Sequence, residues 1–260
     1  MPRRAPAVFV GHGSPLNALA DNAYTRALAR LGQAVGKPPA VLCVSAHWTT
    51  RGVWATHMER PRTIHDFAGF PQELFDVDYP APGSPETAEA SREAAGDAVV
   101  GLDDGEWGLD HGAWSVLRRM YPEADVPIVQ LSVDPSRPGP FHLELGRRLS
   151  ILRERGVLLL GSGNVVHNLA RMDWSGRGAP APWAAAFDEH VRSLTEDGPR
   201  EELAADPDAM PGGSDSVPTP EHWLPYLFAL GAAAGDAVRW EHAGIEHASI
   251  SMRCASFGRG

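Results

Sequence analysis

Short runs dominated by apolar residues alternate along the chain with longer stretches of helical periodicity. A short apolar run bounded by turn residues is typical of a strand that is buried on both faces of a sheet. We expect such strands at residues 7–10, 40–46, 127–133 and 157–161, and further strands at 237–241 and 249–257. Between them, apolar residues recur at helical spacing, which predicts helices at residues 16–35, 84–99, 113–121, 140–155, 182–196 and 220–234.

This alternation predicts an α/β fold with a central, mostly parallel sheet flanked by helices on both faces. No internal repeat and no shift of composition marks a linker, so we expect a single domain over residues 1–260. The longest stretches without periodicity are residues 50–85 and 206–219. Loops of this length inside one domain are more often functional than accidental.

Composition excludes several classes of protein. The 260 residues include 23 Lys and Arg against 33 Asp and Glu, which gives a net charge of −10. Because no basic run extends beyond Arg3-Arg4, the chain lacks the charge pattern of a protein that binds nucleic acid or an anionic membrane. No apolar stretch reaches the roughly 18 residues that span a bilayer, and the N-terminus has no signal-peptide core. We therefore expect a cytoplasmic protein whose two cysteines, Cys43 and Cys254, build neither a disulfide framework nor a thiolate metal cluster.

Three of the eleven histidines follow the predicted strands closely. His12 comes just after the run at 7–10, His47 just after the run at 40–46, and His167 a few residues after a third strand. Ligands of open α/β sheets bind outside the carboxyl ends of the strands, so these side chains are expected near one edge. Imidazole ligands suit zinc, iron, copper or nickel rather than magnesium or calcium.

A fourth histidine, His222, lies in a proline-rich segment before an apolar helix. Thr219 fits the N-cap and Pro220 the first helical position, which predicts that His222 lies in the first turn of that helix. Taken together, the four histidines with their small or aromatic neighbours predict a metal site.

Two more histidines are candidate site residues. His111 precedes a predicted helix and has a glycine and a tryptophan close by, which favours a polar or acid–base role. His65 lies in the first long loop among aromatic residues and glycine, as expected of a segment that covers a substrate. The remaining five are interpreted as structural or solvated: His57, His142, His190, His242 and His247.

These motifs together resemble one known family. They are Gly-His-Gly-Ser-Pro at 11–15, Ser-Ala-His-Trp at 45–48, His-Asp-Phe-x-Gly-Phe-Pro at 65–71, Asp-His-Gly-Ala-Trp at 110–114, Gly-Ser-Gly-Asn-x-x-His-Asn-Leu at 161–169 and Thr-Pro-Glu-His-Trp-x-Pro at 219–225. In this order they resemble the 4,5-DOPA extradiol dioxygenase family, a branch of the class III, LigB-type extradiol ring-cleaving dioxygenases. The resemblance runs from about residue 8 to about residue 257.

The resemblance implies roles for individual residues. His12, His47 and His222 match the metal ligands of the family, and His222 stands where the broader class III pattern has a glutamate. His167 matches a histidine beside the metal, which is close enough to be a fourth ligand in some resting sites and is thought to act as acid–base group in turnover. His111 matches a second active-site histidine, which with His65 is expected to contact the substrate.

The resemblance also implies the cofactor and the substrates. Non-haem Fe(II) is implied for activity, whereas three histidines also describe a stable zinc site, so Zn²⁺ is an expected occupant of purified protein. The implied substrates are O₂ and a catechol such as 4,5-DOPA.

Two other functions are weighed against this one. A zinc hydrolase with His167 or Glu221 as base would use a similar set of residues, although the His-Glu-x-x-His helix of zinc peptidases is missing. A Memo-like protein, which shares the fold and has been regarded as non-enzymatic, would not need all of the site histidines. Metal content distinguishes such a binding protein from an enzyme.

Overall fold

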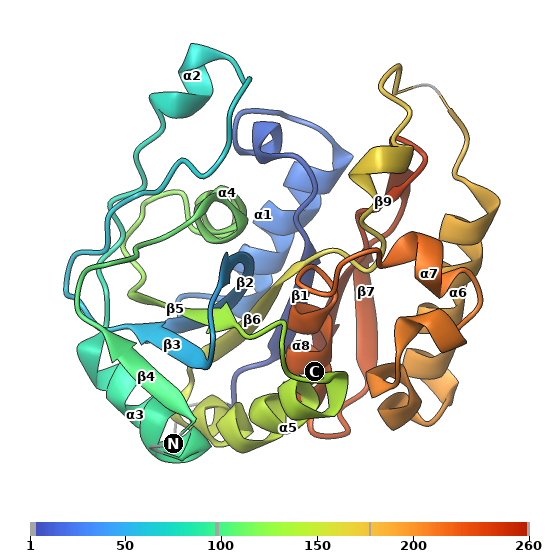
Figure 1. Cartoon of the computed structure of the whole chain (residues 1–260). Helices are drawn as coiled ribbons and strands as arrows, with labels where there is room; N and C mark the ends of the chain where they lie inside the picture. The colour runs from blue at the N-terminus through green and yellow to red at the C-terminus, as the bar shows by residue number, and fades with distance from the viewer. Residues whose placement is uncertain (1–3, 97–98, 177, 259–260) are drawn as a thin grey trace.

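A mixed sheet of eight strands forms the middle layer of the protein (Figure 1). The computed structural model describes residues 4–96, 99–176 and 178–258. In the described residues, the strands in spatial order are β4 (Val100–Asp103), β3 (Val53–Thr56), β5 (Ile128–Val133), β2 (Val41–Thr49), β6 (Leu158–Gly163), β1 (Ala7–Gly11), β10 (Cys254–Phe257) and β7 (Val238–His242). The central strands β5, β2, β6 and β1 are parallel, whereas β3 and β10 pair antiparallel with β5 and β1. A small antiparallel pair, β8 (Ile245–Glu246) and β9 (Ile250–Ser251), stands apart from the sheet.

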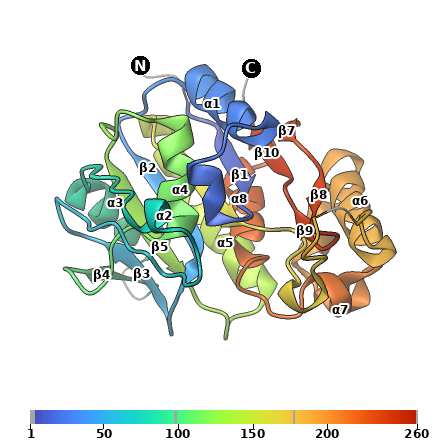
Figure 2. The same cartoon turned by 90° about the horizontal axis from the view of Figure 1, so that it is seen from above.

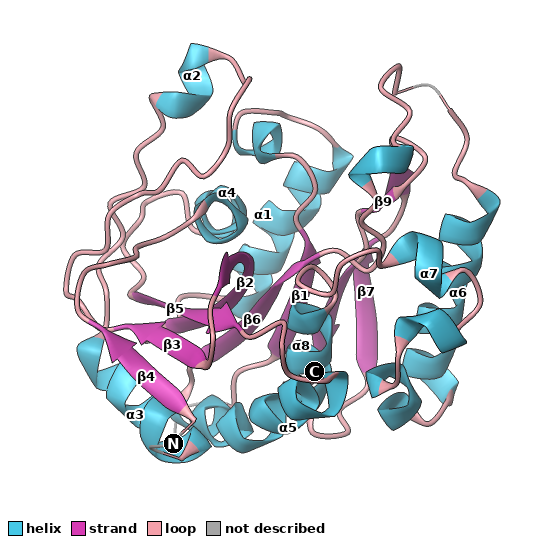
Figure 3. Cartoon of the chain, in the orientation of Figure 1, coloured by secondary structure: helices cyan, strands magenta, loops and turns pink. Residues whose placement is uncertain are grey.

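Helices cover both faces of the sheet, as the sequence predicts (Figure 3). One face carries α1 (Ala23–Val35) and α4 (His111–Met120), and the other carries α3 (Pro85–Ala95), α5 (Gly139–Leu149) and α8 (Leu224–Ala233). At the β7 side of the molecule lie α6 (Pro182–Asp197) and α7 (Gly213–Ser216), and a single turn, α2 (Gln72–Phe75), interrupts the long loop before α3 (Figure 2). Short 3-10 helices occur at Pro15–Ala18, Ser150–Arg155, Leu169–Arg171, Arg200–Ala204 and Pro207–Ala209.

The two faces of the sheet belong to two separate hydrophobic cores. Along β1, Phe9 packs in the core shared with α5 and α8, while its neighbours Val8 and Val10 pack in the core shared with α1 and α4. This alternation explains why the central strands read as continuous apolar runs, because both faces of each strand are covered. Cys43 and Cys254 are buried free thiols within these strands, as expected.

Several predicted elements differ from the structure at their ends. The helix predicted at 16–35 is divided into the 3-10 turn Pro15–Ala18 and α1, with Asn22 capping the second segment through its side chain. The helix predicted to reach residue 99 ends at Ala95, where Gly96 follows with a positive φ of 99°. The strands β3 and β4 and the turn α2 were missed, since they are four residues long and fall in or beside the stretches interpreted as loop and helix.

The expectation that His222 lies in the first turn of a helix capped by Thr219 is wrong. Helix α8 begins at Leu224, and its N-cap position is Trp223, which makes no side-chain cap. The Thr219 hydroxyl instead donates a hydrogen bond to the Glu221 carboxylate, 2.8 Å away. His222 therefore lies in a turn ahead of the helix. None of the helices in the described part of the chain has the length and apolar character that crossing a bilayer requires.

Candidate active site

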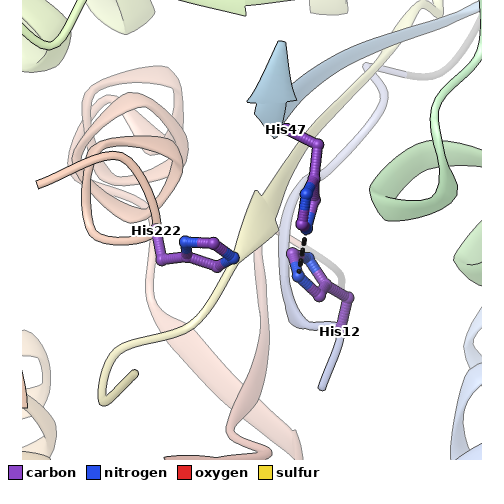
Figure 4. Close-up of side chains that lie close together, drawn as sticks. All are labelled: His12, His47 and His222. Atoms are coloured by element: carbon purple, nitrogen blue, oxygen red, sulfur yellow. Dashed lines mark hydrogen bonds between the residues drawn. The ribbon is translucent and has the colours of Figure 1, made fainter. Parts of the chain in front are cut away.

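Three histidines from distant parts of the chain turn their rings toward one another (Figure 4). The Nε2 atoms of His12 and His47 lie 3.1 Å apart. His12, His47 and His222 each contribute one ring nitrogen to the cluster. These three nitrogens all lie within 4.8 Å of one another. These are the three residues that the sequence resemblance identifies as metal ligands, and the fold brings them together.

Strand ends hold this cluster in place. His12 directly follows β1, and its backbone N–H donates to the carbonyl of Gly163 at the end of the parallel strand β6, 3.0 Å away. His47 lies near the end of β2, on the other side of β6. The turn that carries His222 rests on the end of β6, where the Asn164 backbone N–H donates to the His222 carbonyl at 2.9 Å. The site thus occupies the carboxyl edge of the parallel strands, as expected for an open α/β sheet.

A glycine at position 163 allows this close approach. A Cβ added to Gly163 would lie 2.2 Å from the His222 carbonyl oxygen, which is closer than any side chain permits. Only the absence of a side chain lets the turn that carries His222 lie against the end of the strand.

Each of the three rings has a polar partner on its Nδ1 atom. His12 Nδ1 is 3.0 Å from the Ser162 hydroxyl, which itself donates to the Gly112 carbonyl at 2.5 Å. His222 Nδ1 is 3.1 Å from a Glu221 carboxylate oxygen. His47 Nδ1 is 3.2 Å from Asp66 Oδ2. Since each partner favours the proton on Nδ1, each Nε2 is left with a lone pair for a ligand.

The three residues fit a metal ion of the kind that imidazole binds. His222 Nε2 is buried and has no hydrogen-bond partner among the described residues. Burial, followed by the neighbouring histidines, holds the pKa of His12 and of His222 well below the usual range, so both rings are neutral. Neutral nitrogen donors that face one another, one of them otherwise unpaired, form the donor set of a zinc or iron site.

His167 lies beside the cluster and belongs to a different group. Its ring is stacked on that of His222, with centroids 3.5 Å apart and an interplanar angle of 8°. One of its ring nitrogens groups with a carboxylate oxygen of Glu221 and a ring nitrogen of His222, rather than with His12 and His47. Burial, then the charge of His47, lowers the pKa of His167 to about 4, so its ring is a neutral acceptor at neutral pH.

His111 lies next to His47, at the first position of α4. The ring centroids of His47 and His111 are 3.8 Å apart, and the His111 Nδ1 atom lies 2.9 Å from Asp66 Oδ2. Burial lowers the pKa of His111, although the hydrogen bond to Asp66 opposes this. Burial likewise disfavours ionisation of Asp66, but the hydrogen bonds from His111 and His47 outweigh it and hold the pKa of Asp66 well below its ordinary value.

His65 lies in an aromatic group next to His111 rather than in the cluster. Its Nε2 atom donates to the Val77 carbonyl at 2.9 Å, which anchors the long loop. Its ring neighbours are Phe67 and Trp114, each with a centroid 5.7 Å away, and Phe67 in turn lies 5.5 Å from the His111 ring. His65 is therefore connected to the site indirectly, because Phe67 packs against both His65 and His111.

The five histidines interpreted as structural or solvated lie in other surroundings, and one of them, His190, is in α6. His57 contacts Asp104 and Glu89 on the surface, and His142 is buried with its Nε2 atom donating to the Asp134 carbonyl. His242 packs on Tyr24, and His247 contacts the Asp173 carbonyl.

Sequence reasoning missed the residues that orient the rings. Ser162 and Asp66 lie inside the quoted motifs, but nothing local shows that they contact His12 and His47. A buried network beneath the site was also missed: Asp110 caps α4, accepts from the Ser45 hydroxyl at 2.6 Å, and is contacted by the Gln130 side-chain amide. The cue available in the sequence was Asp110 immediately before a helical pattern, which is an N-cap signal.

The fold and the cluster define an α/β protein with a potential metal site built from histidines at the sheet edge. Residues 10–258 match the family described as the catalytic LigB subunit of aromatic ring-opening dioxygenase. The chain belongs to this LigB family. It is accordingly an oxidoreductase, an extradiol aromatic ring-opening dioxygenase.

Similar proteins come from bacteria and plants. A protein of Escherichia coli (strain K12) named 4,5-DOPA dioxygenase extradiol is 51% identical, over 98% of this chain and 95% of its own length. A Beta vulgaris protein of the same name is 38% identical, over 86% of this chain and 85% of its own. The crystal structure of an uncharacterized Escherichia coli K12 protein superposes with a TM-score of 0.86 at 46% identity, covering 98% of this chain and 100% of that one.

Proposed function

We propose that this enzyme cleaves the ring of a catechol such as 4,5-DOPA with O₂, at a metal ion held by His12, His47 and His222. The observation that carries the proposal is the convergence of three imidazole nitrogens, two of them 3.1 Å apart, at the carboxyl edge of the parallel strands. The names of the similar proteins in Escherichia coli and Beta vulgaris support the catechol.

The metal that we propose for activity is non-haem Fe(II), with Zn²⁺ as an occupant of purified protein. When bound, Fe(II) supplies a redox-active centre with positions open to both the diol and O₂. His12 and His222 are neutral because they are buried, which is the form that a metal requires. The neutral donor set suits iron and zinc alike, so elemental analysis of the purified protein is needed to identify the bound metal.

His167 is the residue that we propose to take a proton from the catechol hydroxyl. It stacks on His222 beside the cluster, and no described residue hydrogen-bonds its ring nitrogens. A neutral ring with a free nitrogen at the site can accept a proton and return it later. If the stacked position brings that nitrogen within reach of the metal, His167 also serves as the fourth ligand in the resting enzyme.

His111 and His65 are proposed to contact the substrate. His111 is buried beside His47, so its ring can bind a polar group of a molecule at the cluster. His65 holds the loop that brings Phe67 against His111, and this aromatic surface can pack on the ring of a catechol. His65 would therefore affect substrate affinity more than turnover.

Alanine variants test the assignment of ligands. His12→Ala, His47→Ala and His222→Ala are each expected to lose stoichiometric metal, measured by elemental analysis after anaerobic reconstitution with Fe(II). His167→Ala should keep most of the metal but lose turnover, measured as O₂ uptake with L-DOPA and a panel of other catechols. His57→Ala, which alters a surface histidine paired with Asp104, is the matched control and should match the wild type.

The outcome separates the three functions. Iron-loaded wild type that consumes no O₂ with any catechol would overturn the proposed reaction. Retained stoichiometric zinc with amide or ester hydrolysis would identify a zinc hydrolase, and absence of stoichiometric metal would point to a binding protein. Membership of the LigB family favours neither a zinc hydrolase nor a non-enzymatic binding protein.

A further inference from the structure

One carboxylate serves two histidines of the site at once. Asp66 Oδ2 lies 2.9 Å from Nδ1 of His111 and 3.2 Å from Nδ1 of His47. Its other oxygen, Oδ1, accepts a hydrogen bond from the backbone N–H of His111 at 2.9 Å. The Asp66 side chain is only 16% exposed, so water competes little for these contacts.

The two oxygens of Asp66 have different effects. Oδ1 satisfies a backbone N–H at the start of α4, which has no partner within the helix, and so fastens the long loop to this helix. Oδ2 accepts from two rings, and therefore favours the proton on Nδ1 of both. For His47 this leaves the Nε2 lone pair facing His12, and for His111 it leaves Nε2 as an acceptor beside the cluster.

Asp66 differs in this respect from the partners of the other two rings. Ser162 is the partner of His12, and Glu221 is the partner of His222. Within the described residues, neither side chain hydrogen-bonds a second site histidine, although a Glu221 carboxylate oxygen lies within 4.8 Å of a ring nitrogen of His167. Of the three Nδ1 partners described, Asp66 is the one that contacts both a proposed metal ligand and a proposed substrate-binding histidine.

We propose that Asp66 is a positioning residue that sets the tautomer of His47 and of His111 together, and so links metal binding to substrate turnover. The inference rests on the proposed function for its turnover part. Its metal-binding part depends only on the geometry of the rings. Carboxylate partners of this kind fix the ring orientation and raise the basicity of a ligand histidine.

The variant Asp66→Asn isolates the effect of Oδ2. Asparagine has the same shape, and its amide oxygen can still accept from the His111 backbone N–H, so the loop stays fastened. Its amide NH₂ group replaces Oδ2 and is a donor that faces two N–H donors, which forces both rings toward the other tautomer. Asp78→Asn is the matched control, because Asp78 lies in the same loop, is exposed, and among the described residues has only Thr63 as a side-chain hydrogen-bond partner.

The first measurement is metal binding without turnover. Calorimetric titration of metal-free protein with Zn²⁺ is expected to show about 10- to 100-fold weaker binding for Asp66→Asn and no change for Asp78→Asn. Equal affinity of Asp66→Asn and wild type would overturn the proposal, whether or not the enzyme has dioxygenase activity.

The second measurement reads the tautomers directly. In metal-free protein carrying ¹⁵N in the histidine rings, at a mildly alkaline pH, His47 and His111 should show the Nδ1–H tautomer. Their signals are assigned by their absence in His47→Ala and His111→Ala. Asp66→Asn should move both rings toward the Nε2–H tautomer, and Asp78→Asn should move neither. A change in one ring alone, or in none, would contradict the shared role.

Turnover is the third measurement. At saturating Fe(II), Asp66→Asn should lower kcat for O₂ uptake by about 10- to 100-fold and change KM for the catechol less, because the loop and its aromatic residues keep their place. An unchanged kcat in an active enzyme would overturn the link to turnover. A wild type that is inactive with every catechol refutes the proposed reaction instead, and leaves the first two measurements to decide on Asp66.

Discussion

At the scale of single residues, the environment of each histidine decides what its ring does. His12 and His222 are buried, so their pKa values are depressed and their rings stay neutral. Their Nδ1 partners, the Ser162 hydroxyl and the Glu221 carboxylate, then decide which nitrogen faces the cluster. Burial alone would give a neutral ring of either tautomer, and the partner alone would favour protonation in the case of Glu221. Both are needed for a ligand lone pair at the centre.

His142 shows the same burial without any function at the site, and it gives a prediction for stability. Burial lowers the pKa of His142 to about 4, whereas an unfolded histidine titrates near 6.5. Between these values the unfolded chain binds more protons than the folded one, so stability falls as the pH falls from about 6.5 to about 4. At pH 5 this residue accounts for about 2 kcal/mol of lost stability relative to pH 7.

The measurement is urea unfolding of metal-free wild type and His142→Gln at pH 7 and pH 5. The wild type should lose about 2 kcal/mol more than the variant. His57→Gln is the contrasting control. A hydrogen bond to Asp104 raises the pKa of His57, so protonation of His57 stabilises the folded state as the pH falls. In His57→Gln, the loss of unfolding free energy between pH 7 and pH 5 should therefore be larger than in the wild type. An identical loss in wild type and His142→Gln would contradict the assignment.

At the scale of elements, the site depends on how closely the turn before α8 approaches the end of β6. Gly163 permits this approach, since an alanine Cβ would lie 2.2 Å from the His222 carbonyl oxygen. Gly163→Ala should push the turn outward and move His222 away from His12 and His47. We expect at least a tenfold loss of Zn²⁺ affinity in calorimetric titration, with secondary structure retained by circular dichroism.

Gly36→Ala is the control for the effect of any glycine replacement. Gly36 ends α1 with a φ of 78° and a ψ of −164°, a backbone conformation that favours glycine, and has open space around it, so alanine there should cost roughly 1–3 kcal/mol of stability. Its Zn²⁺ affinity should equal that of the wild type. If Gly163→Ala also kept wild-type affinity, the close contact with the turn would not be what holds His222.

The elements that could be predicted from the sequence are those whose structure follows from a clear local pattern of apolar and polar residues. The central strands were found because burial on both faces leaves a local apolar run. Strand β3 was missed because Trp54 is 40% exposed and the strand has only four residues, so its pattern is weak. The helix start before Leu224 was misplaced because Thr219-Pro220 has the local sequence of a capped helix, whereas the Glu221 side chain and the packing on β6 make it a turn.

The same distinction applies to the site. His12 and His47 were found through their motifs and their places after strands, and His222 was found through its motif before an apolar helix, all of which are local features. The pairing of Asp66 with His111 joins residues 45 positions apart and depends on how the long loop crosses α4. No periodicity or spacing records such a contact, so only the folded structure identifies Asp66 as the partner of two rings.

At the scale of the whole molecule, we propose that residues 1–260 form one catalytic domain. Support comes from the family match over residues 10–258 and from the sheet, in which β1 pairs with β10 near the other end of the chain. The proposed ligands are spread from residue 12 to residue 222, so metal binding joins β1, β2 and the turn before α8. The cytoplasmic location expected from the sequence stays a prediction.

Because the ligands come together only in the folded chain, metal binding should stabilise the whole domain. A ligand that binds the folded state alone adds RT ln(1 + [L]/Kd), about 4 kcal/mol at a free concentration 1,000 times Kd. For a domain of this size each kcal/mol raises Tm by roughly 2–4 °C, so Zn²⁺ should raise the Tm of chelator-treated protein by roughly 8–16 °C. Scanning calorimetry should show one transition that moves as a unit. His47→Ala should show little shift with Zn²⁺, whereas His57→Ala should shift like the wild type. A wild-type transition that zinc leaves in place, or that zinc splits in two, would contradict a single domain closed by the three histidines.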